Sequence, residues 1–171
     1  MHPRGLVWTH RVGKSGRFRV FVGSGVITGE YRASLDEKGR VLIPLKVRAA
    51  LEGAGLIVTR GIDQCIWLFP EPEWRRVASN LMESTSLFQS RARMIHRRII
   101  APAQDSEFDK SGRLNLPPSL REYAGLTKEC VVLGIESYLE IWDEEVYRAY
   151  WEENEAEFQE AAEELGKIVS I

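Results

Sequence analysis

An eleven-residue stretch occurs twice in this chain, and this repetition constrains the fold more than any other feature. Residues 34–44 read SLDEKGRVLIP, and residues 107–117, which begin 73 positions later, read EFDKSGRLNLP. The same offset continues downstream as far as Arg75 and Arg148. A repeat of this length predicts one supersecondary unit used twice, as a pseudo-symmetric pair rather than a solenoid.

Each copy has the residues of a tight turn between two strands. The Asp that opens the turn, Asp36 or Asp109, can accept hydrogen bonds from the turn's backbone, and the Gly three residues later tolerates a positive φ. An Arg follows each Gly, at Arg40 and Arg113. Because a turn does not need this Arg, it is the residue that calls for a functional explanation.

Periodicity around the turns predicts the same short elements in both units. We expect strands at residues 30–35, 41–43, 56–59 and 65–69 with a helix at 45–51, then strands at 104–108, 114–116, 130–133 and 138–142 with a helix at 118–124. The fold class is therefore α+β with a mainly β core. We divide the chain into a basic amino-terminal extension (1–28), a first repeat with two helices (29–100), a second repeat with a carboxy-terminal helix (101–166) and a tail (167–171).

Helical patterns follow each unit. The first is an apolar stripe of Trp74, Val77, Ala78 and Leu81, and the second is a stripe of Phe88, Ala92, Ile95 and Ile99 that begins at a capping box of Ser86 and Gln89. The last is a narrow seam of Tyr147, Trp151, Asn154, Phe158, Ala161 and Leu165 among many Glu residues. Such a seam packs either on the chain's own core or on another subunit.

Composition excludes several classes of protein. The 171 residues contain no apolar run near the roughly 20 residues that a membrane helix needs, and the two Cys and three His lack metal-ligand spacing. Isolated Cys residues suit a reducing cytoplasm. The net charge is only −2, but residues 1–48 hold ten Lys and Arg against three acidic residues, whereas residues 136–171 hold two against twelve. This polarity predicts one surface for a polyanion and a separate acidic surface.

The repeated stretches and their flanks resemble the MraZ family of bacterial transcription regulators, whose fold is related to AbrB-type DNA-binding domains. The matching segments are residues 29–31, 34–40, 43–44 and 48 in the first unit and residues 109–113, 116–118, 120–126 and 139–142 in the second. One Asp-x-x-Gly-Arg alone is weak evidence. Two copies in the same context, with a shared downstream pattern, are strong evidence.

This resemblance implies a fold and a function. The two units would intertwine into one swapped-hairpin barrel with flanking helices, so that one chain mimics an AbrB-type dimer. The Asp-x-x-x-Arg motifs would face double-stranded DNA. Subunits would form ring-shaped homo-oligomers on short tandem promoter repeats of the division and cell-wall gene cluster, in the cytoplasm and associated with the nucleoid. No cofactor, membrane or small-molecule substrate is implied.

The side-chain chemistry suits DNA contact. The planar fork of Arg40 or Arg113 matches the O6 and N7 acceptors of guanine in the major groove. Asp36 or Asp109 would hold that fork or cap the turn. The cations Lys38, Lys110, Lys46 and Arg48 are assigned to phosphates, which supply affinity and salt dependence.

Other roles for these residues stay open at this point. Asp36 and Asp109 are foremost turn formers, and Arg40 and Arg113 can instead form ion pairs within the chain. Arg48 and its equivalent Arg121 can pair with nearby acidic residues. The Arg cluster at residues 91–98 is either a solvated helix face or a second DNA contact. The basic extension either adds DNA contacts or precedes a true start at residue 26.

The sequence leaves two rival functions to consider. A pair of carboxylates related by pseudo-symmetry can form a proton-sharing enzyme dyad, but an Arg four residues after each Asp favours the ionised form of both. No nucleophile–base pair appears, so we do not expect an enzyme. A protein-binding scaffold or antitoxin-like module on the same fold is the second rival, because fold alone does not fix function.

Overall fold

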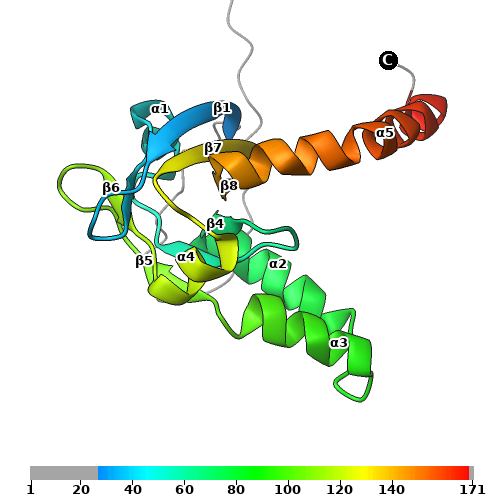
Figure 1. Ribbon diagram of the computed structural model, residues 1–171. Helices are drawn as coiled ribbons and strands as arrows, with labels where there is room; N and C mark the ends of the chain where they lie inside the picture. The colour runs from blue at the N-terminus through cyan, green and yellow to red at the C-terminus, as the bar shows by residue number, and fades with distance from the viewer. Residues whose placement is uncertain (1–26, 170–171) are drawn as a thin grey trace, which may run out of the picture.

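The computed structural model describes residues 27–169 (Figure 1). Its elements are β1 (Ile27–Ser34), β2 (Arg40–Leu42), α1 (Leu45–Leu51), β3 (Leu56–Arg60), β4 (Ile66–Pro70), α2 (Glu71–Glu83), α3 (Ser90–Ile95), the π-helix η1 (His96–Ile100), β5 (Gln104–Ser106), β6 (Arg113–Asn115), α4 (Pro118–Ala124), β7 (Glu129–Glu136), β8 (Tyr138–Asp143) and α5 (Glu144–Ile168). The strands and helices expected in both units are confirmed, and α1 and α4 match residue for residue. Of the extension expected at residues 1–28, all but residues 27 and 28 lies outside the described residues, and these two belong to β1.

The strands form an open six-stranded sheet in the order β1-β7-β8-β4-β3-β5 and a two-stranded ribbon of β2 and β6. Strands of the first unit pair with strands of the second at four places: β1 with β7, β3 with β5, β4 with β8, and β2 with β6, all antiparallel. The two units therefore interlock and neither can form its sheet alone. The expected barrel is not closed, because β1 and β5 stand at opposite edges of the sheet.

The internal repeat contains a one-residue shift that the sequence offset conceals. Ala33 pairs with Cys130, and Ser106, 73 positions after Ala33, pairs with Leu56. Leu56 therefore corresponds to Cys130, at an offset of 74. The uniform offset of 73 assumed from the sequence is wrong within β7, where the loop after α4 carries one additional residue.

The core lies between the sheet, the ribbon and the two short helices. Val41, Ile43, Leu114, Leu116 and Leu120 are fully buried in one cluster with apolar residues of β3, β4, β7 and β8. In the ribbon, Val41 and Leu114 point inward, so the residues on either side of them face outward. Burial of this alternating set fixes which face of the ribbon meets solvent.

The α2–α3 hairpin differs from its predicted pattern. The helix begins at Ser90, with Gln89 at the N-cap position and no side-chain capping bond, so the predicted capping box is wrong. Phe88 lies before the helix and is 97% exposed, and Ile95 is also exposed, whereas Ala92 and Ile99 are buried as expected. The stripe expected along α2 is only half-buried.

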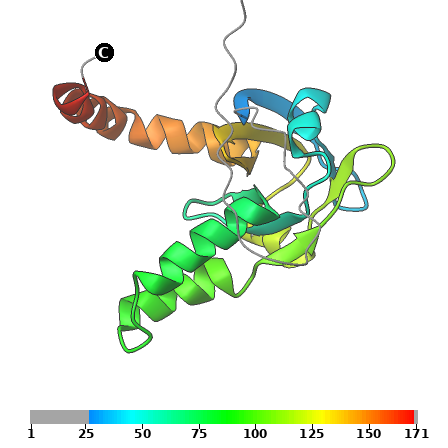
Figure 2. The ribbon, with the colours of Figure 1, turned by 180° about the vertical axis from the view of Figure 1, so that it is seen from behind.

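Helix α5 begins on the sheet and then leaves it. The carboxylate of Asp143 caps it by accepting hydrogen bonds from the backbone N–H groups of Glu145 and Val146. Tyr147 packs on Trp142, but every residue from 155 to 169 is exposed. Figure 2 shows α5 and the α2–α3 hairpin projecting from the body in different directions. Beyond its first three turns, the helix does not pack on the chain's own core. Packing of the seam on that core, one of the two expectations from the sequence, is therefore wrong for this part of α5.

Candidate nucleic-acid interface

The two repeated turns have nearly identical backbones. In the first, the Asp36 carbonyl oxygen accepts from the Gly39 N–H at 2.9 Å, and in the second the Asp109 carbonyl accepts from Gly112 at 2.9 Å. Both glycines have a φ of +76°, the left-handed region that glycine adopts most readily. The turns thus need the Gly at this position for conformational reasons.

Each Asp caps its own turn. Asp36 Oδ1 accepts hydrogen bonds from the backbone N–H groups of Lys38 and Arg40, both at 3.0 Å. Asp109 Oδ1 accepts from Ser111 at 2.8 Å and from Arg113 at 3.0 Å. One carboxylate oxygen of each Asp therefore fixes the backbone that carries the following Arg.

The second oxygen of each Asp joins the two turns in a four-residue ion network. Asp36 Oδ2 accepts from Arg40 Nε at 2.9 Å and Nη2 at 2.8 Å, and it lies 3.4 Å from Arg113 Nη1. Asp109 Oδ2 lies 3.5 Å from Arg113 Nε and 3.3 Å from Arg40 Nη1. The structure thus shows both roles considered for the Asp residues, and it shows ion pairs within the chain for both Arg residues.

This network is half-exposed rather than sequestered. The side chains of Arg40, Asp36, Asp109 and Arg113 are 26%, 30%, 33% and 36% exposed. The charges within the network cancel, so any attraction for a polyanion has to come from cations around it. Lys38 and Lys110 on the turns and Lys46 on α1 are exposed and serve that purpose.

The network keeps both carboxylates ionised. The side-chain hydrogen bond from Arg40 lowers the pKa of Asp36 to about 2, with further help from the backbone N–H groups of Arg40 and Lys38. The pKa of Asp109 is also lowered, first by the backbone hydrogen bond from Arg113. Two carboxylates that are both ionised near neutral pH hold no proton to share, which opposes the aspartic-dyad mechanism.

Two helix arginines cross from one unit to the turn of the other. Arg48 of α1 lies against Gly112, and its Nη1 donates to the Ser111 carbonyl oxygen at 3.5 Å. Arg121 of α4 lies over Gly39, where an added Cβ would come within 2.5 Å of the guanidinium carbon. Neither Arg forms an ion pair within residues 27–169. Glycine is therefore required a second time, because it leaves room for the partner unit's Arg.

The ribbon presents two residues that sequence reasoning did not single out. Leu42 is 53% exposed and Asn115 is exposed, and they lie on the outward face with Arg40 and Arg113. In the register, Arg40 pairs with Asn115 and Leu42 pairs with Arg113. The alternation with buried Val41 and Leu114 was the available signal, since it places these four side chains on one face.

The remaining sequence-predicted cations lie elsewhere. Arg91, Arg93, Arg97 and Arg98 belong to α3 and η1, on the hairpin that projects from the body and not on the ribbon. Arg98 donates to the Tyr123 hydroxyl at 2.7 Å, and its guanidinium lies over the Tyr123 ring. The structure does not bring this cluster into the turn network.

Other chemistry is scarce in residues 27–169. No group of His, Cys, Asp and Glu there has the arrangement of a metal site, and no helix is long and apolar enough to span a membrane. Cys65 and Cys130 are buried, and burial raises the pKa of both thiols, of Cys130 to about 11. Such thiols are protonated core side chains and not nucleophiles.

Fold and site together define a class of protein: an internally duplicated, interlocked β protein that presents two Arg-bearing turns on one face. A family model described as "MraZ protein, putative antitoxin-like" matches this chain twice, at residues 26–98 and 99–168, with the two matches starting 73 residues apart. The chain belongs to the MraZ family.

Relatives named "Transcriptional regulator MraZ" cover most of the chain. The protein of Treponema denticola is 47% identical over 142 residues, which are 83% of this chain and 99% of that protein. The protein of Treponema pallidum is 48% identical over 138 residues, 81% of this chain and 93% of the relative. That of Lactobacillus delbrueckii subsp. bulgaricus is 40% identical over 140 residues, 82% and 96%. These names designate regulators and not enzymes.

Proposed function

We propose that this protein is a sequence-specific DNA-binding transcription regulator whose paired turns read the major groove. The observation that carries the proposal is the meeting of two identical Asp-x-x-Gly-Arg turns on one exposed ribbon face. The names of the relatives support transcription regulation. The family resemblance adds the target, a promoter of the division and cell-wall gene cluster, which would be bound on the nucleoid in the cytoplasm.

The ribbon has the right form for this task. The major groove of B-DNA admits a two-stranded β-ribbon, and an arginine fork reads guanine through its end-on nitrogens. Asp36 holds Arg40 through the side-on edge, Nε and Nη2, with short contacts, while the end-on Nη1 makes only a 3.3 Å contact to Asp109. Loss of that one weaker contact would free Nη1 to donate to a base, while Asp36 still fixes the direction of the guanidinium.

The neighbouring side chains would make the other contacts with DNA. Asn115 carries an amide that matches the adenine N6 and N7 edge, and Leu42 is an apolar group suited to a thymine methyl. The exposed Lys38, Lys110 and Lys46 would contact phosphates, which contribute affinity without sequence information. In this assignment Asp36 and Asp109 position the two Arg side chains. Arg48 would contact the DNA phosphates and also stabilise the turn of the second unit.

One chain offers few contacts, so we propose that occupancy depends on several linked subunits. Avidity from a ring-shaped homo-oligomer would engage tandem repeats together, and affinity would rise steeply with the number of repeats. A protein-binding, antitoxin-like module is the second candidate function. The description of the family and the acidic, uncovered α5 favour it.

Fluorescence anisotropy on duplexes from upstream of the protein's own gene tests the proposal. Arg40→Ala should weaken binding on the order of 10- to 100-fold, because a good bidentate contact contributes about 1–3 kcal/mol of discrimination. Arg75→Ala is the matched control, since Arg75 lies on α2 and pairs with Glu71 of its own helix. Equal binding by both variants would contradict the assignment, and a wild-type chain that binds no upstream DNA would favour the antitoxin-like candidate.

A further inference from the structure

The outward face of the ribbon has two equivalent arginines with unlike neighbours. Under the internal repeat, Arg40 corresponds to Arg113, and Leu42 corresponds to Asn115. The antiparallel register places Arg40 opposite Asn115 and Arg113 opposite Leu42. Directly opposite residues have their Cβ atoms about 4.5–5.5 Å apart, so each arginine stands next to one of these two side chains. One arginine therefore has an amide as its neighbour, and the other has an apolar group.

Both unlike side chains are available to a ligand. Leu42 is 53% exposed, and Asn115 is exposed as well. The backbone carbonyl oxygen of Asn115 accepts a hydrogen bond from the Ser106 hydroxyl at 3.1 Å, whereas its side-chain amide makes no hydrogen bond within residues 27–169. The equivalent of Ser106 is Ala33, which has no hydroxyl to donate to Leu42. Strand β5 thus fixes the backbone of Asn115 and leaves its amide free.

The two arginines are also held differently. Asp36 Oδ2 accepts from Arg40 Nε at 2.9 Å and from Nη2 at 2.8 Å. The corresponding contact of Arg113 is longer, with 3.5 Å between its Nε and Asp109 Oδ2. The Arg113 side chain is 36% exposed, against 26% for Arg40. The two halves of the face therefore differ in the geometry of the arginine as well as in its neighbour.

The unlike neighbours match different bases. An asparagine amide matches the N7 acceptor and the N6 donor of adenine, and an apolar side chain contacts the C5-methyl group of thymine. Successive bases of one strand are about 3.4 Å apart along the helix axis. An arginine on guanine and the residue opposite it are separated by a similar distance, so they reach neighbouring base pairs. The base next to the guanine is therefore read differently in the two halves.

We propose that Leu42 and Asn115 give the reading face a direction, so that one chain selects a non-palindromic DNA site. A face with exact two-fold symmetry selects a palindrome, because operator symmetry mirrors protein symmetry. In this chain, Arg40 with Asn115 reads a guanine next to an adenine in one half of the site. Arg113 with Leu42 reads a guanine next to a thymine in the other half. The inference rests on the proposed function and names the residues that set its specificity.

Selection from a library of short duplexes tests the direction. Each duplex has one randomised window of about 10 base pairs, one helical turn, and the duplexes bound by the full chain are sequenced. Wild-type protein should enrich a non-palindromic site. Leu42→Asn makes the two neighbours alike and should enrich a palindrome with adenine next to both guanines. Asn115→Leu should enrich a palindrome with thymine next to both.

Fluorescence anisotropy then measures the size of the change. Relative to wild type, Leu42→Asn should shift the ratio of affinities for the adenine palindrome and the wild-type site on the order of 10-fold, because it gains one bidentate contact with adenine. The double variant Leu42→Asn, Asn115→Leu contains both kinds of neighbour again. It should return to a non-palindromic preference, a recovery that a damaged ribbon would not show.

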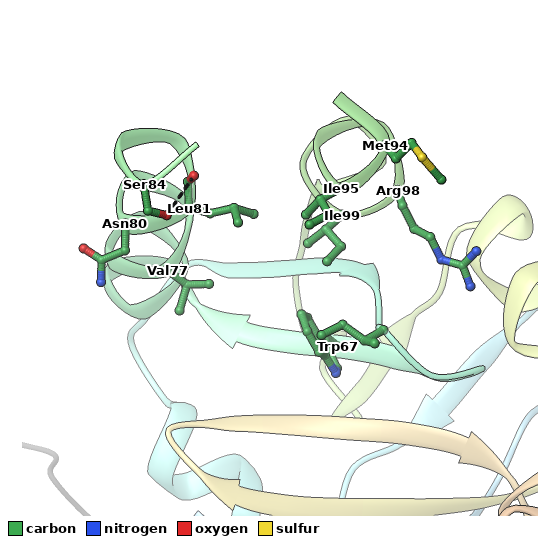
Figure 3. A pocket seen from close by; sticks show the side chains of 10 residues that line it. Trp67, Val77, Asn80, Leu81, Ser84, Met94, Ile95, Arg98 and Ile99 are labelled. Carbon is green, nitrogen blue, oxygen red and sulfur yellow. Dashed lines mark hydrogen bonds between the residues drawn. The ribbon is translucent and has the colours of Figure 1, made fainter. Parts of the chain in front are cut away.

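The controls make the same two substitutions on the α2–α3 hairpin, outside the ribbon. Asn80→Leu lies on the wall of the apolar groove between α2 and the α3–η1 segment, a cavity of about 700 Å³ (Figure 3). Leu87→Asn lies between α2 and α3, where the side chain is 61% exposed. Neither control should change the enriched sequence. Unaltered urea denaturation shows that the ribbon variants are folded.

The failure of this inference and the failure of the proposed function give different results. A palindrome enriched by wild-type protein overturns the direction alone, as does an unchanged non-palindromic site enriched by Leu42→Asn. A wild-type protein that enriches no sequence contradicts the proposed function itself, and the direction falls with it.

Discussion

The duplicated core is symmetric, whereas the helices attached to it differ between the two units. In the core, each strand of one unit pairs with a strand of the other, and equivalent residues such as Val41 and Leu114 are equally buried. The attached helices differ completely: a basic hairpin with a groove follows the first unit, and one acidic helix follows the second.

This difference separates two kinds of association. Pseudo-symmetry within the chain already completes the two-fold pairing that a dimer of single units would supply. Identical appendages would favour further two-fold contacts, which close after two subunits, whereas unlike appendages favour head-to-tail contacts that continue around a ring. The symmetric part of the chain presents the paired turns, and the unlike helices give the two units different outer surfaces.

The largest effect is expected in the shared core. Leu114→Ala should lower the free energy of unfolding by about 2–5 kcal/mol, because it leaves a cavity at a fully buried site between the units. Leu42→Ala on the outward face of the same ribbon should change the free energy of unfolding by no more than about 0.5 kcal/mol. Urea denaturation measures both values. Similar losses for the two variants would mean that the ribbon does not have the inward and outward faces described.

A smaller effect is expected at the crossing of helix and turn. Gly112→Ala should destabilise the chain by about 1–3 kcal/mol, since the residue has a positive φ and its Cβ would overlap Arg48. Gly53→Ala is the matched control, with a φ of +81° and no neighbouring atom within 4 Å of the new Cβ. Equal losses in urea denaturation would show that only backbone strain matters and that Arg48 does not lock the opposite turn.

The smallest effect concerns acid stability. The folded-state pKa of Asp36 is lowered to about 2, below the value of about 3.9 for an unfolded Asp, so its ionised form stabilises the fold. This stabilisation is fully present above about pH 5 and is lost as the pH falls through about 4 to 2. Asp36→Asn should make the denaturation midpoint depend less on pH in that window. An unchanged pH profile would show that the network does not stabilise the turn.

Much of the fold could be predicted because local patterns determine it. The Pro residues before α1 and at the start of α4, and the alternation in the strands, placed both helices and most strands from the sequence. One failure was also local: Ser86 and Gln89 have the sequence of a capping box, yet the helix begins one residue after Gln89 and Phe88 is left exposed. A capping sequence does not by itself determine where the helix begins.

The site was predictable only in part. The repeated turn identified Asp36, Arg40 and their equivalents, but the crossing of Arg48 onto the other unit's turn depends on tertiary packing that no spacing reveals. Asn115 was missed because its equivalent in the first unit is Leu42, so the repeat itself gave no signal there. Only the register of the ribbon places it beside Arg40.

The most direct test of the account is the specificity ratio of the double variant Arg40→Ala, Arg113→Ala. Affinity is measured for an upstream duplex and for a scrambled duplex of the same length, each at several salt concentrations. If these forks read bases, the ratio should fall toward one while the salt dependence, which reports phosphate contacts, changes little. An unchanged ratio would contradict the central claim that the paired arginines recognise DNA sequence.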